Sequence, residues 1–466
     1  MATGYLPYNI DQRLLLPLDM RSWLPEGHLA LFVSDVVDSL DLSAIRAVDD
    51  AKDRRGRAGY HPAMMVKLLV YGYCIGKPSS RKIERATYDE VPFRVLAGDQ
   101  HPDHDTIAAF RQQHLKALGG MFMQVLRLCQ RAGLVKLGHI AIDGTKIRAN
   151  ASKHKAMSYG RMDEAEKKLQ DEIDRLLAEA ERVDAEEQAR FGKTCRGDEL
   201  PAELARRESR LHKIREAKAA LETEAKVKAA AEAAEAKAKL EERARKEAES
   251  GKRSGGKPPV VPDPDQAKPD PKAQRNFTDP ESRIMPDGGH KGSFIQGYNA
   301  QIAVDAEAQI IVAADVTQDT QDKRQLIPMA EKVIDNVGRL ADTTSADAGY
   351  FSEHAVQSHA LARTNLLVPP DRLKHGQDIG MPNHPLAENA SSAQRMRHKL
   401  RTEEDRSLYK RRKAIVEPVF GQIKAVRGLR SFLLRGIDRV REELNIIAMT
   451  HNLLKLFRFS APASQA

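Results

Sequence analysis

Apolar side chains recur three and four positions apart through most of the first 134 residues, which is the spacing of helices that pack on one face. The runs HPAMMVKLLVYGYCIG and HDTIAAFRQQHLKALGGMFMQVLRLC show this spacing, and prolines stand near the starts or breaks of such runs. We therefore expect residues 1–134 to form a bundle of helices.

A helix, a short turn and a second helix are expected between Ser80 and Leu118. The same order occurs in DNA-binding helix-turn-helix motifs and in ordinary helical bundles, so the pattern leaves both interpretations open. The basic and titratable side chains of this stretch are Arg81, Lys82, Arg85, Arg111, His114 and Lys116.

A different pattern covers residues 161–250, where charged residues and alanine dominate and Phe191 is the only aromatic residue. Such a stretch cannot form a thick core, but its apolar positions make a narrow stripe for helix pairing. The stripe consists of Met162, Ala165, Leu169, Ile173, Leu176, Ala180 and Val183. Because Gly192, Gly197 and Pro201 interrupt the pattern, we expect residues 151–250 to form an inserted helical hairpin, an exposed arm without chemistry of its own.

Residues 251–277 combine proline, glycine and charge without periodicity, and residues before proline are biased away from helix. We expect this segment to be a mobile linker.

Strand patterns occur in residues 135–150 and 278–460. The segments NAQIAVDAEAQIIVAADVT, LGHIAIDGT, TTSADAGY and NLLVPP carry them, and the first reads as two strands joined by a short loop. Helical patterns separate and follow the later strands. This order predicts an α/β domain with a mixed sheet and helices on its faces.

Two aspartates stand where such strands end. Asp143 follows HIAI and precedes Gly144, and Asp347 follows TTSA. Loops at strand ends can bring reactive polar groups together, although an Asp-Gly pair there is also a common turn. Both residues are therefore candidate catalytic acids, with turn formation as the alternative.

The third candidate acid, Glu417, lies in a basic helical segment. Lys and Arg outnumber Asp and Glu by 15 to 6 between residues 395 and 442. An isolated acid in such a basic segment is explained either by an ion pair, for which Lys413 is suitably spaced, or by a bound cation. Helical spacing places Glu417 opposite the apolar stripe of Ile415, Val419, Ile423 and Val426.

Composition narrows the class of protein. A formal charge of +9 and a pI of about 9.2 favour a polyanionic partner, with nucleic acid first. The three cysteines lie far apart, which supports neither a disulfide framework nor a thiolate zinc site. The N-terminus lacks a signal-peptide pattern and no long apolar run occurs, so we expect a cytoplasmic protein without a membrane span.

Three motifs together resemble the DDE transposases of bacterial insertion sequences. They are Asp-Gly-Thr after a first strand (143–145), Asp-Ala-Gly-Tyr after a later strand (347–350) and Glu-Pro-x-Phe-Gly-x-x-Lys on a basic helix (417–424). Residues 279–285 and 297–305 are similar to further family segments.

The resemblance implies an RNase H-like catalytic core in which Asp143, Asp347 and Glu417 bind two Mg²⁺ or Mn²⁺ ions. The family pattern Tyr, Arg, Glu, Lys has two, three and six intervening residues. Here Lys424 fits, Lys413 occupies the arginine position and Tyr409 is one residue too far away, so Arg412 is a possible substitute. The candidate DNA-binding residues are Lys410, Arg411, Arg412, Lys413, Lys424, Arg427 and Arg430.

The expected activity is metal-dependent cleavage and strand transfer at the ends of a mobile element. The partners would be terminal inverted repeats, target DNA and further copies of the chain, at the nucleoid. A catalytically inactive DNA-binding derivative is one alternative, and a structural coiled-coil protein, suggested by the arm, is another.

Overall fold

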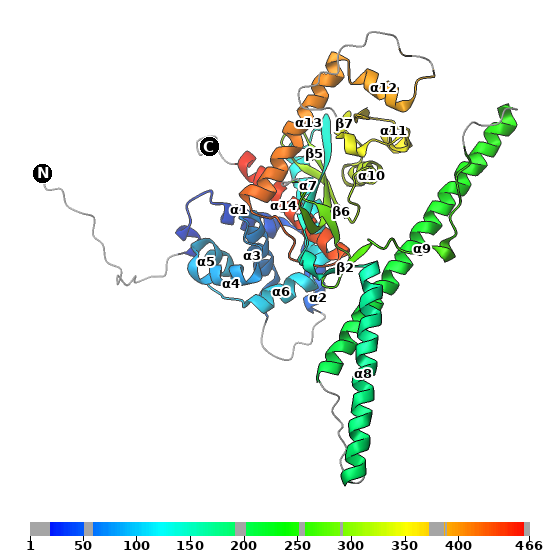
Figure 1. Ribbon diagram of the computed structural model, residues 1–466. Coiled ribbons are helices and arrows are strands. Elements are labelled where there is room, and N and C mark those ends of the chain that lie inside the picture. Colours follow the sequence, from blue (N-terminus) through cyan, green and yellow to red (C-terminus); the bar gives the residue numbers. More distant parts are fainter. Residues whose placement is uncertain are drawn as a thin grey trace, which may run out of the picture. The chain divides into compact units, whose positions relative to one another are not determined.

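The computed structural model (Figure 1) describes residues 19–50, 59–191, 202–250, 257–288, 292–371, 386 and 389–460. The chain divides into two units. Unit 1 comprises Met1–Ile147 and Asn299–Ala466, and unit 2 comprises Arg148–Tyr298. The fold is mixed α/β, as predicted.

The N-terminal part of unit 1 is helical, which confirms the expected bundle. Its helices are η1 (Met20–Trp23), α1 (Leu29–Ser39), α2 (Ser43–Asp50), α3 (Pro62–Cys74), α4 (Ser80–Asp89), α5 (Val91–Ala97), α6 (His104–Gln113) and α7 (Leu115–Arg131). Helix α3 is buried along nearly its whole length, as its apolar sequence requires. The Asp103 carboxylate caps α6 by accepting a hydrogen bond from the Thr106 amide at 2.7 Å.

A mixed sheet follows. Its strands in unit 1 are β1 (His139–Arg148), β5 (Phe294–Asp305), β6 (Ile311–Thr317), β7 (Thr343–Ala346) and β8 (Asn365–Leu367). Strand β5 pairs antiparallel with β6 and is the neighbour of β1, while β7 pairs in parallel with both β1 and β8. Strands β1 and β5 continue into unit 2, where β5 pairs with β4 (Arg283–Pro286).

Helices flank this sheet, as predicted for an RNase H-like core. They are η4 (Ala348–Tyr350), α10 (Leu326–Val337), α11 (Glu353–Val356), η5 (His359–Leu361), α12 (Ser392–Lys399), α13 (Glu403–Gly421), η6 (Gln422–Val426) and α14 (Ile437–Ser460). Helices α10 and α14 pack on β6, and α13 packs on β7. The Asn452 side chain ties α14 to the sheet because its amide group exchanges two hydrogen bonds, of 2.8 and 2.9 Å, with the backbone of Ile311.

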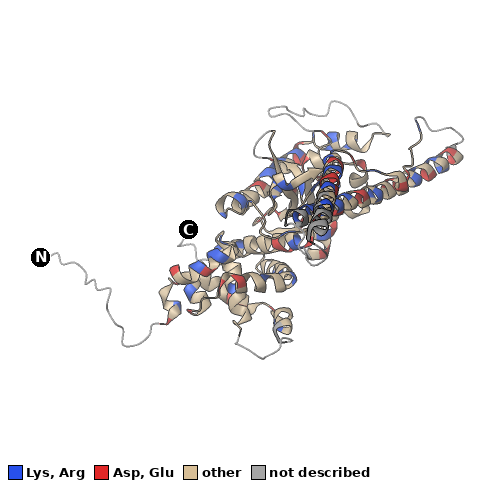
Figure 2. Cartoon of the chain, turned by 60° about the horizontal axis from the view of Figure 1, so that its bottom comes forward, with Lys and Arg blue, Asp and Glu red and all other residues tan. Residues whose placement is uncertain are grey.

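Unit 2 contains the arm predicted from the sequence. Helix α8 (Tyr159–Phe191) packs against α9 (Ala202–Ser250). Figure 2 shows acidic and basic residues interspersed along the two long helices. Residues 192–201, where the interruption was expected, lie outside the described residues. The apolar seam consists of Met162, Leu169, Ile173, Leu211, Ile214, Ala217 and Leu221.

The segment expected to be a linker differs from that expectation where the structure describes it, from residue 257 onward. It contains η3 (Pro264–Gln266) and β3 (Gln274–Asn276). Strand β3 pairs antiparallel with β2 (Ala156–Ser158), which directly follows η2 (Lys153–Lys155) in the chain. Buried Asn276 also donates a hydrogen bond to the Ser152 carbonyl at 2.8 Å. The prolines of this segment end at Pro271 and lie outside β3, so they do not prevent that short strand from pairing.

Cys74 and Cys129 are buried free thiols, and Cys195 lies outside the described residues. None of the helices that the structure describes has the length and apolar character needed to cross a membrane.

Candidate active site

Strand pairing brings the first two predicted acids together. Strands β1 and β7 run in parallel with Ile142 opposite Ala346, so the next residues of the two strands are Asp143 and Asp347. The two aspartates therefore lie at the same level of two adjacent strands. Asp347 directly follows the end of β7, as expected, but Asp143 lies inside β1, which continues to Arg148, so the expectation that Asp143 stands at a strand end is wrong.

Asp143 is largely buried and held on both oxygens. Its Oδ2 accepts a hydrogen bond from Arg412 Nη1 at 3.0 Å, and its Oδ1 accepts one from the Gly144 amide at 2.8 Å. Burial raises the pKa of Asp143 to about 6 despite the opposing effect of Arg412, and the Asp347 charge adds to the rise. The two carboxylates thus act on each other electrostatically.

Asp347 caps the short helix η4, whose Gly349 amide donates to its Oδ1 at 2.8 Å. The last residue of the Asp-Ala-Gly-Tyr motif, Tyr350, is fully buried, and its hydroxyl donates a hydrogen bond to Gln301 Oε1 on β5. The motif therefore contains both a carboxylate and the tyrosine that anchors its turn to the sheet.

A third acid, Asp322, was missed by the sequence interpretation. It lies between β6 and α10, and its Oδ1 accepts hydrogen bonds from Asn299 Nδ2 at 2.6 Å and from Gln301 Nε2 at 2.8 Å. Lys146 Nζ lies 3.5 Å from the same oxygen. A signal was present, because Asn299 and Gln301 are polar residues at alternate positions of a buried strand and need partners there.

Gly144 is required by this network. A Cβ atom at residue 144 would lie 2.3 Å from Gln301 Nε2, 2.8 Å from Asp322 Oδ1 and 3.1 Å from Asn299 Oδ1. The glycine of Asp-Gly-Thr therefore serves close packing, and the alternative that Asp-Gly forms a turn is wrong because β1 continues through it.

Two cations join the basic helix to β1. Arg412 of α13 reaches Asp143, and Lys424 of η6 donates hydrogen bonds to Thr145 Oγ1 at 2.5 Å and to the Lys146 carbonyl at 2.8 Å. Residues Gln422–Val426 form a π-helical turn. A π turn is wider than an α turn and advances each residue by less than ~100°, so it rotates Lys424 toward the face that Arg412 occupies.

Glu417 is exposed on α13. Within the described residues, it does not gather with Asp143 and Asp347 into a group of three acids that could hold a metal ion. It lies five positions after Arg412 along the helix, which corresponds to a rotation of roughly 140°. The structure therefore pairs the two aspartates and leaves Glu417 on another face. Of the predicted stripe, Ile415, Val419 and Ile423 are buried, whereas Val426 is 79% exposed at the end of the π turn.

The helix also shows how the family spacing is accommodated. Tyr409 interacts with Arg412, and burial, together with Asp347 and Asp143, raises the pKa of Tyr409. Tyr409 and Arg412 retain the two-residue spacing, so the extra residue falls between Arg412 and Glu417. Lys413, which occupies the arginine position when counted from Glu417, is exposed and does not take that place.

The candidate DNA-binding residues differ in accessibility. Lys410, Arg411, Lys413 and Arg430 are exposed, and Lys424 is half-buried. Arg427 is only 4% exposed and donates hydrogen bonds to Thr450 Oγ1 at 2.9 Å and to the Ile447 carbonyl. The expectation that Arg427 binds DNA is therefore wrong, because its buried guanidinium is hydrogen-bonded to residues of α14. Likewise, Arg111 and His114 of the possible helix-turn-helix are buried.

The donor chemistry at the aspartates fits a divalent cation in part. Adjacent carboxylates supply the hard oxygen ligands that Mg²⁺ and Mn²⁺ prefer. However, in the part of the chain that the structure describes, no three His, Cys, Asp or Glu side chains gather closely enough to hold a metal ion. Asp143 and Asp347 are the pair available for this purpose.

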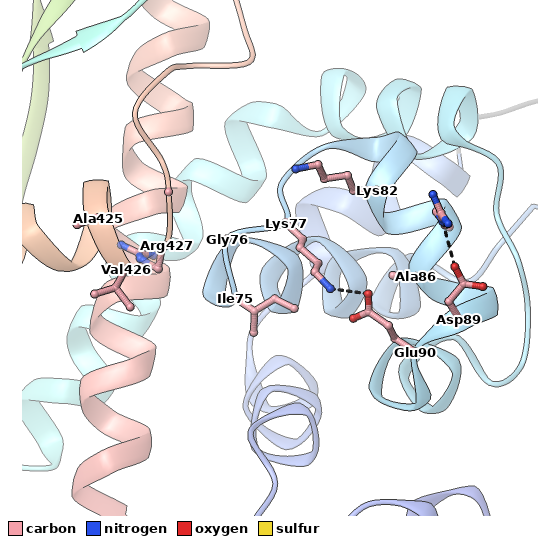
Figure 3. A pocket seen from close by; sticks show the side chains of 12 residues that line it. Ile75, Gly76, Lys77, Lys82, Ala86, Asp89, Glu90, Ala425, Val426 and Arg427 are labelled. Carbon is pink, nitrogen blue, oxygen red and sulfur yellow. Dashed lines mark hydrogen bonds and ion pairs between the residues drawn. The ribbon is translucent and has the colours of Figure 1, made fainter.

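A separate cavity of about 460 Å³ lies between the α3–α4 region and the end of η6 (Figure 3). Two of its cations already have acidic partners: Lys77 pairs with Glu90, and Arg85 pairs with Asp89 at 3.1 Å. Because these charges are neutralised locally, the cavity is a weaker candidate for an anionic ligand than the region around the aspartates.

Two models of known protein families match the chain. A model described as a transposase domain (DUF772) matches residues 18–113, and a model described as a transposase DDE domain matches residues 268–453. Asp347 and Glu417 lie within the second match, whereas Asp143 lies outside both. No curated protein and no solved structure matches the chain. With the two transposase models in chain order over more than half of its length, the chain belongs to the DDE transposases of insertion sequences.

Proposed function

We propose that the protein cleaves phosphodiester bonds at the ends of its own mobile element and joins those ends to target DNA. The observation that carries the proposal is the parallel pairing of β1 and β7, which places Asp143 beside Asp347 under a basic helix. The family to which the chain belongs uses divalent metals and acts on DNA. Terminal inverted repeats, target DNA at the nucleoid and further copies of the chain are the proposed partners.

Asp143 and Asp347 would hold two Mg²⁺ or Mn²⁺ ions, with Glu417 as the third proposed ligand. When bound, such ions activate a water or a 3′ hydroxyl and stabilise the departing oxygen of an in-line displacement. Because Glu417 lies on another face of α13, its participation requires a local change in that helix beyond Arg412 when DNA binds. Pro418 and the adjacent π turn are features at which helices bend and shift.

The chain's own cations would bind the DNA. Lys410, Arg411 and Arg430 are exposed and available to phosphates, which give affinity without sequence preference. Arg412 has further N–H donors beyond the one that binds Asp143, so it can position a phosphate next to the aspartates.

A cleavage assay tests the proposal. Duplex oligonucleotides that carry the inverted repeats flanking the gene are incubated with the full chain in Mg²⁺ or Mn²⁺. Asp347→Asn should lose cleavage by more than roughly 100-fold and retain DNA binding, because a carboxylate ligand is lost. Asp342→Asn is the matched control, since Asp342 precedes the same strand and is exposed.

The inactive DNA-binding derivative remains the second candidate. It predicts that wild-type protein binds the repeats and never cuts them in either metal. Deletion of residues 161–250 addresses the structural alternative, because a structural role should vanish with the arm while cleavage by the core survives.

A further inference from the structure

Asp322 is the point at which several side chains around the two aspartates converge. One of its oxygens, Oδ1, interacts with Asn299 and Gln301 on β5 and with Lys146 on β1. Its side chain is 24% exposed, and it lies in the connection between β6 and α10.

One branch of the network leads to β1. Lys146 stands three residues after Asp143, is 16% exposed, and lies within the electrostatic influence of Asp322, Asp143 and Asp347. Gly144, between Asp143 and Lys146, lets the Asp322 carboxylate approach the strand directly. Asp322 thus restrains the segment of β1 that carries Asp143.

The other branch leads to η4. Gln301 donates to Asp322 through Nε2 and accepts the Tyr350 hydroxyl through Oε1. Tyr350 is the last residue of the short helix that Asp347 caps. The orientation of the Gln301 amide, fixed by Asp322, therefore determines whether Tyr350 finds an acceptor, and so restrains the turn that carries Asp347.

We propose that Asp322 is a positioning residue that sets the spacing of Asp143 and Asp347, acting through Lys146 on one side and through Gln301 and Tyr350 on the other. This inference rests on the proposed function, because the spacing matters for a shared divalent cation. Residues behind the ligands of a metal site commonly change cation affinity by 10- to 100-fold when they are replaced.

Cation binding by the full chain without DNA tests the inference. Mn²⁺ is titrated and followed by electron paramagnetic resonance, with folding checked by circular dichroism. Tyr350→Phe removes one hydroxyl and no charge, and should weaken Mn²⁺ binding about 10-fold. Asp322→Ala should weaken it at least as much. The matched control is Asp319→Asn, which removes an exposed carboxylate from the same connection and should leave affinity unchanged.

The double variant Asp322→Ala/Tyr350→Phe separates positioning from simple loss of charge. If both residues act through Gln301, the double variant should bind Mn²⁺ no more weakly than Asp322→Ala alone. Additive losses, or unchanged affinity in Tyr350→Phe, would overturn the inference.

Asp143→Asn distinguishes this failure from a failure of the proposed function. If wild type and Asp143→Asn bind Mn²⁺ equally, the cation site is wrong and the inference falls with it. If Asp143→Asn binds weakly while the Asp322 and Tyr350 variants match wild type, only the inference is wrong.

Discussion

The guanidinium of Arg412 lies 3.0 Å from the Asp143 carboxylate, so a cation of the chain itself occupies one of the two acids proposed to bind metal. The pair is well shielded, with side-chain exposures of 9% for Arg412 and 20% for Asp143. A shielded ion pair of this kind competes with any other cation for the carboxylate.

Arg412→Gln should therefore raise Mn²⁺ affinity in the absence of DNA by roughly tenfold, because the competing charge is removed. Cleavage of DNA should fall, since a proposed phosphate contact is lost at the same time. Lys413→Gln, at the exposed neighbouring position, should change the Mn²⁺ affinity little. A decrease in Mn²⁺ affinity on replacing Arg412 would contradict the competition between the two cations.

The raised pKa of Asp143 predicts a specific dependence of stability on pH. Because the carboxyl has a pKa of about 6 in the folded chain and an ordinary value near 4 when unfolded, the folded state takes up a proton between these values. Wild type should thus lose stability relative to Asp143→Asn as pH rises from about 4 to 6, by up to about 3 kcal/mol. Urea unfolding of both chains without divalent ions measures the difference, and a difference that stays flat over this window would exclude the raised pKa.

Gly144→Ala should destabilise unit 1 by about 1–3 kcal/mol, because the new methyl group overlaps the side chains of Gln301 and Asp322. Gly138→Ala is the control at the start of the same strand, where a Cβ meets nothing within 4 Å. Thermal unfolding compares the two variants. Equal melting temperatures would show that the side chains of Gln301 and Asp322 move aside without loss of stability.

Arg427 and Arg430 provide a matched pair for the DNA-binding assignments. Arg430→Gln should reduce the slope of log affinity against log salt by about 0.9, because an exposed phosphate contact is lost. Arg427→Gln should leave that slope unchanged and lower the free energy of unfolding by about 1–3 kcal/mol, since buried hydrogen bonds to α14 are lost. DNA-binding isotherms at several salt concentrations and urea unfolding distinguish the two variants. A reduced salt slope in Arg427→Gln together with an unchanged slope in Arg430→Gln would contradict these assignments.

The sequence indicated Asp347 at a strand end because the end of β7 follows from local pattern. It placed Asp143 at a strand end as well, but β1 continues through Asp-Gly-Thr to Arg148, and the parallel register that sets the two acids at one level is a tertiary feature. It could not predict which face of α13 turns toward β1. That choice depends on whether Arg412 or Lys413 meets Asp143, and a shift of one residue rotates the helix by ~100°. The position of Glu417 was open for this reason.

Asn299 and Gln301 indicated that buried polar partners exist, but the sequence could not identify Asp322 as that partner. The segment TQDTQDKRQ resembles an ordinary polar connection, and an acid before a helix is common. Only the sheet register places Gln301 beside Gly144 and Tyr350 within reach of Gln301, so the network depends on tertiary contacts that local pattern does not encode.

Unit 2 departs from unit 1 at Ile147 and rejoins it at Asn299, on two strands that are immediate neighbours in the sheet. A tight β-hairpin turn would connect these strands equally well. The helical arm within this excursion can consequently change in length without altering the order of the strands that carry the acids.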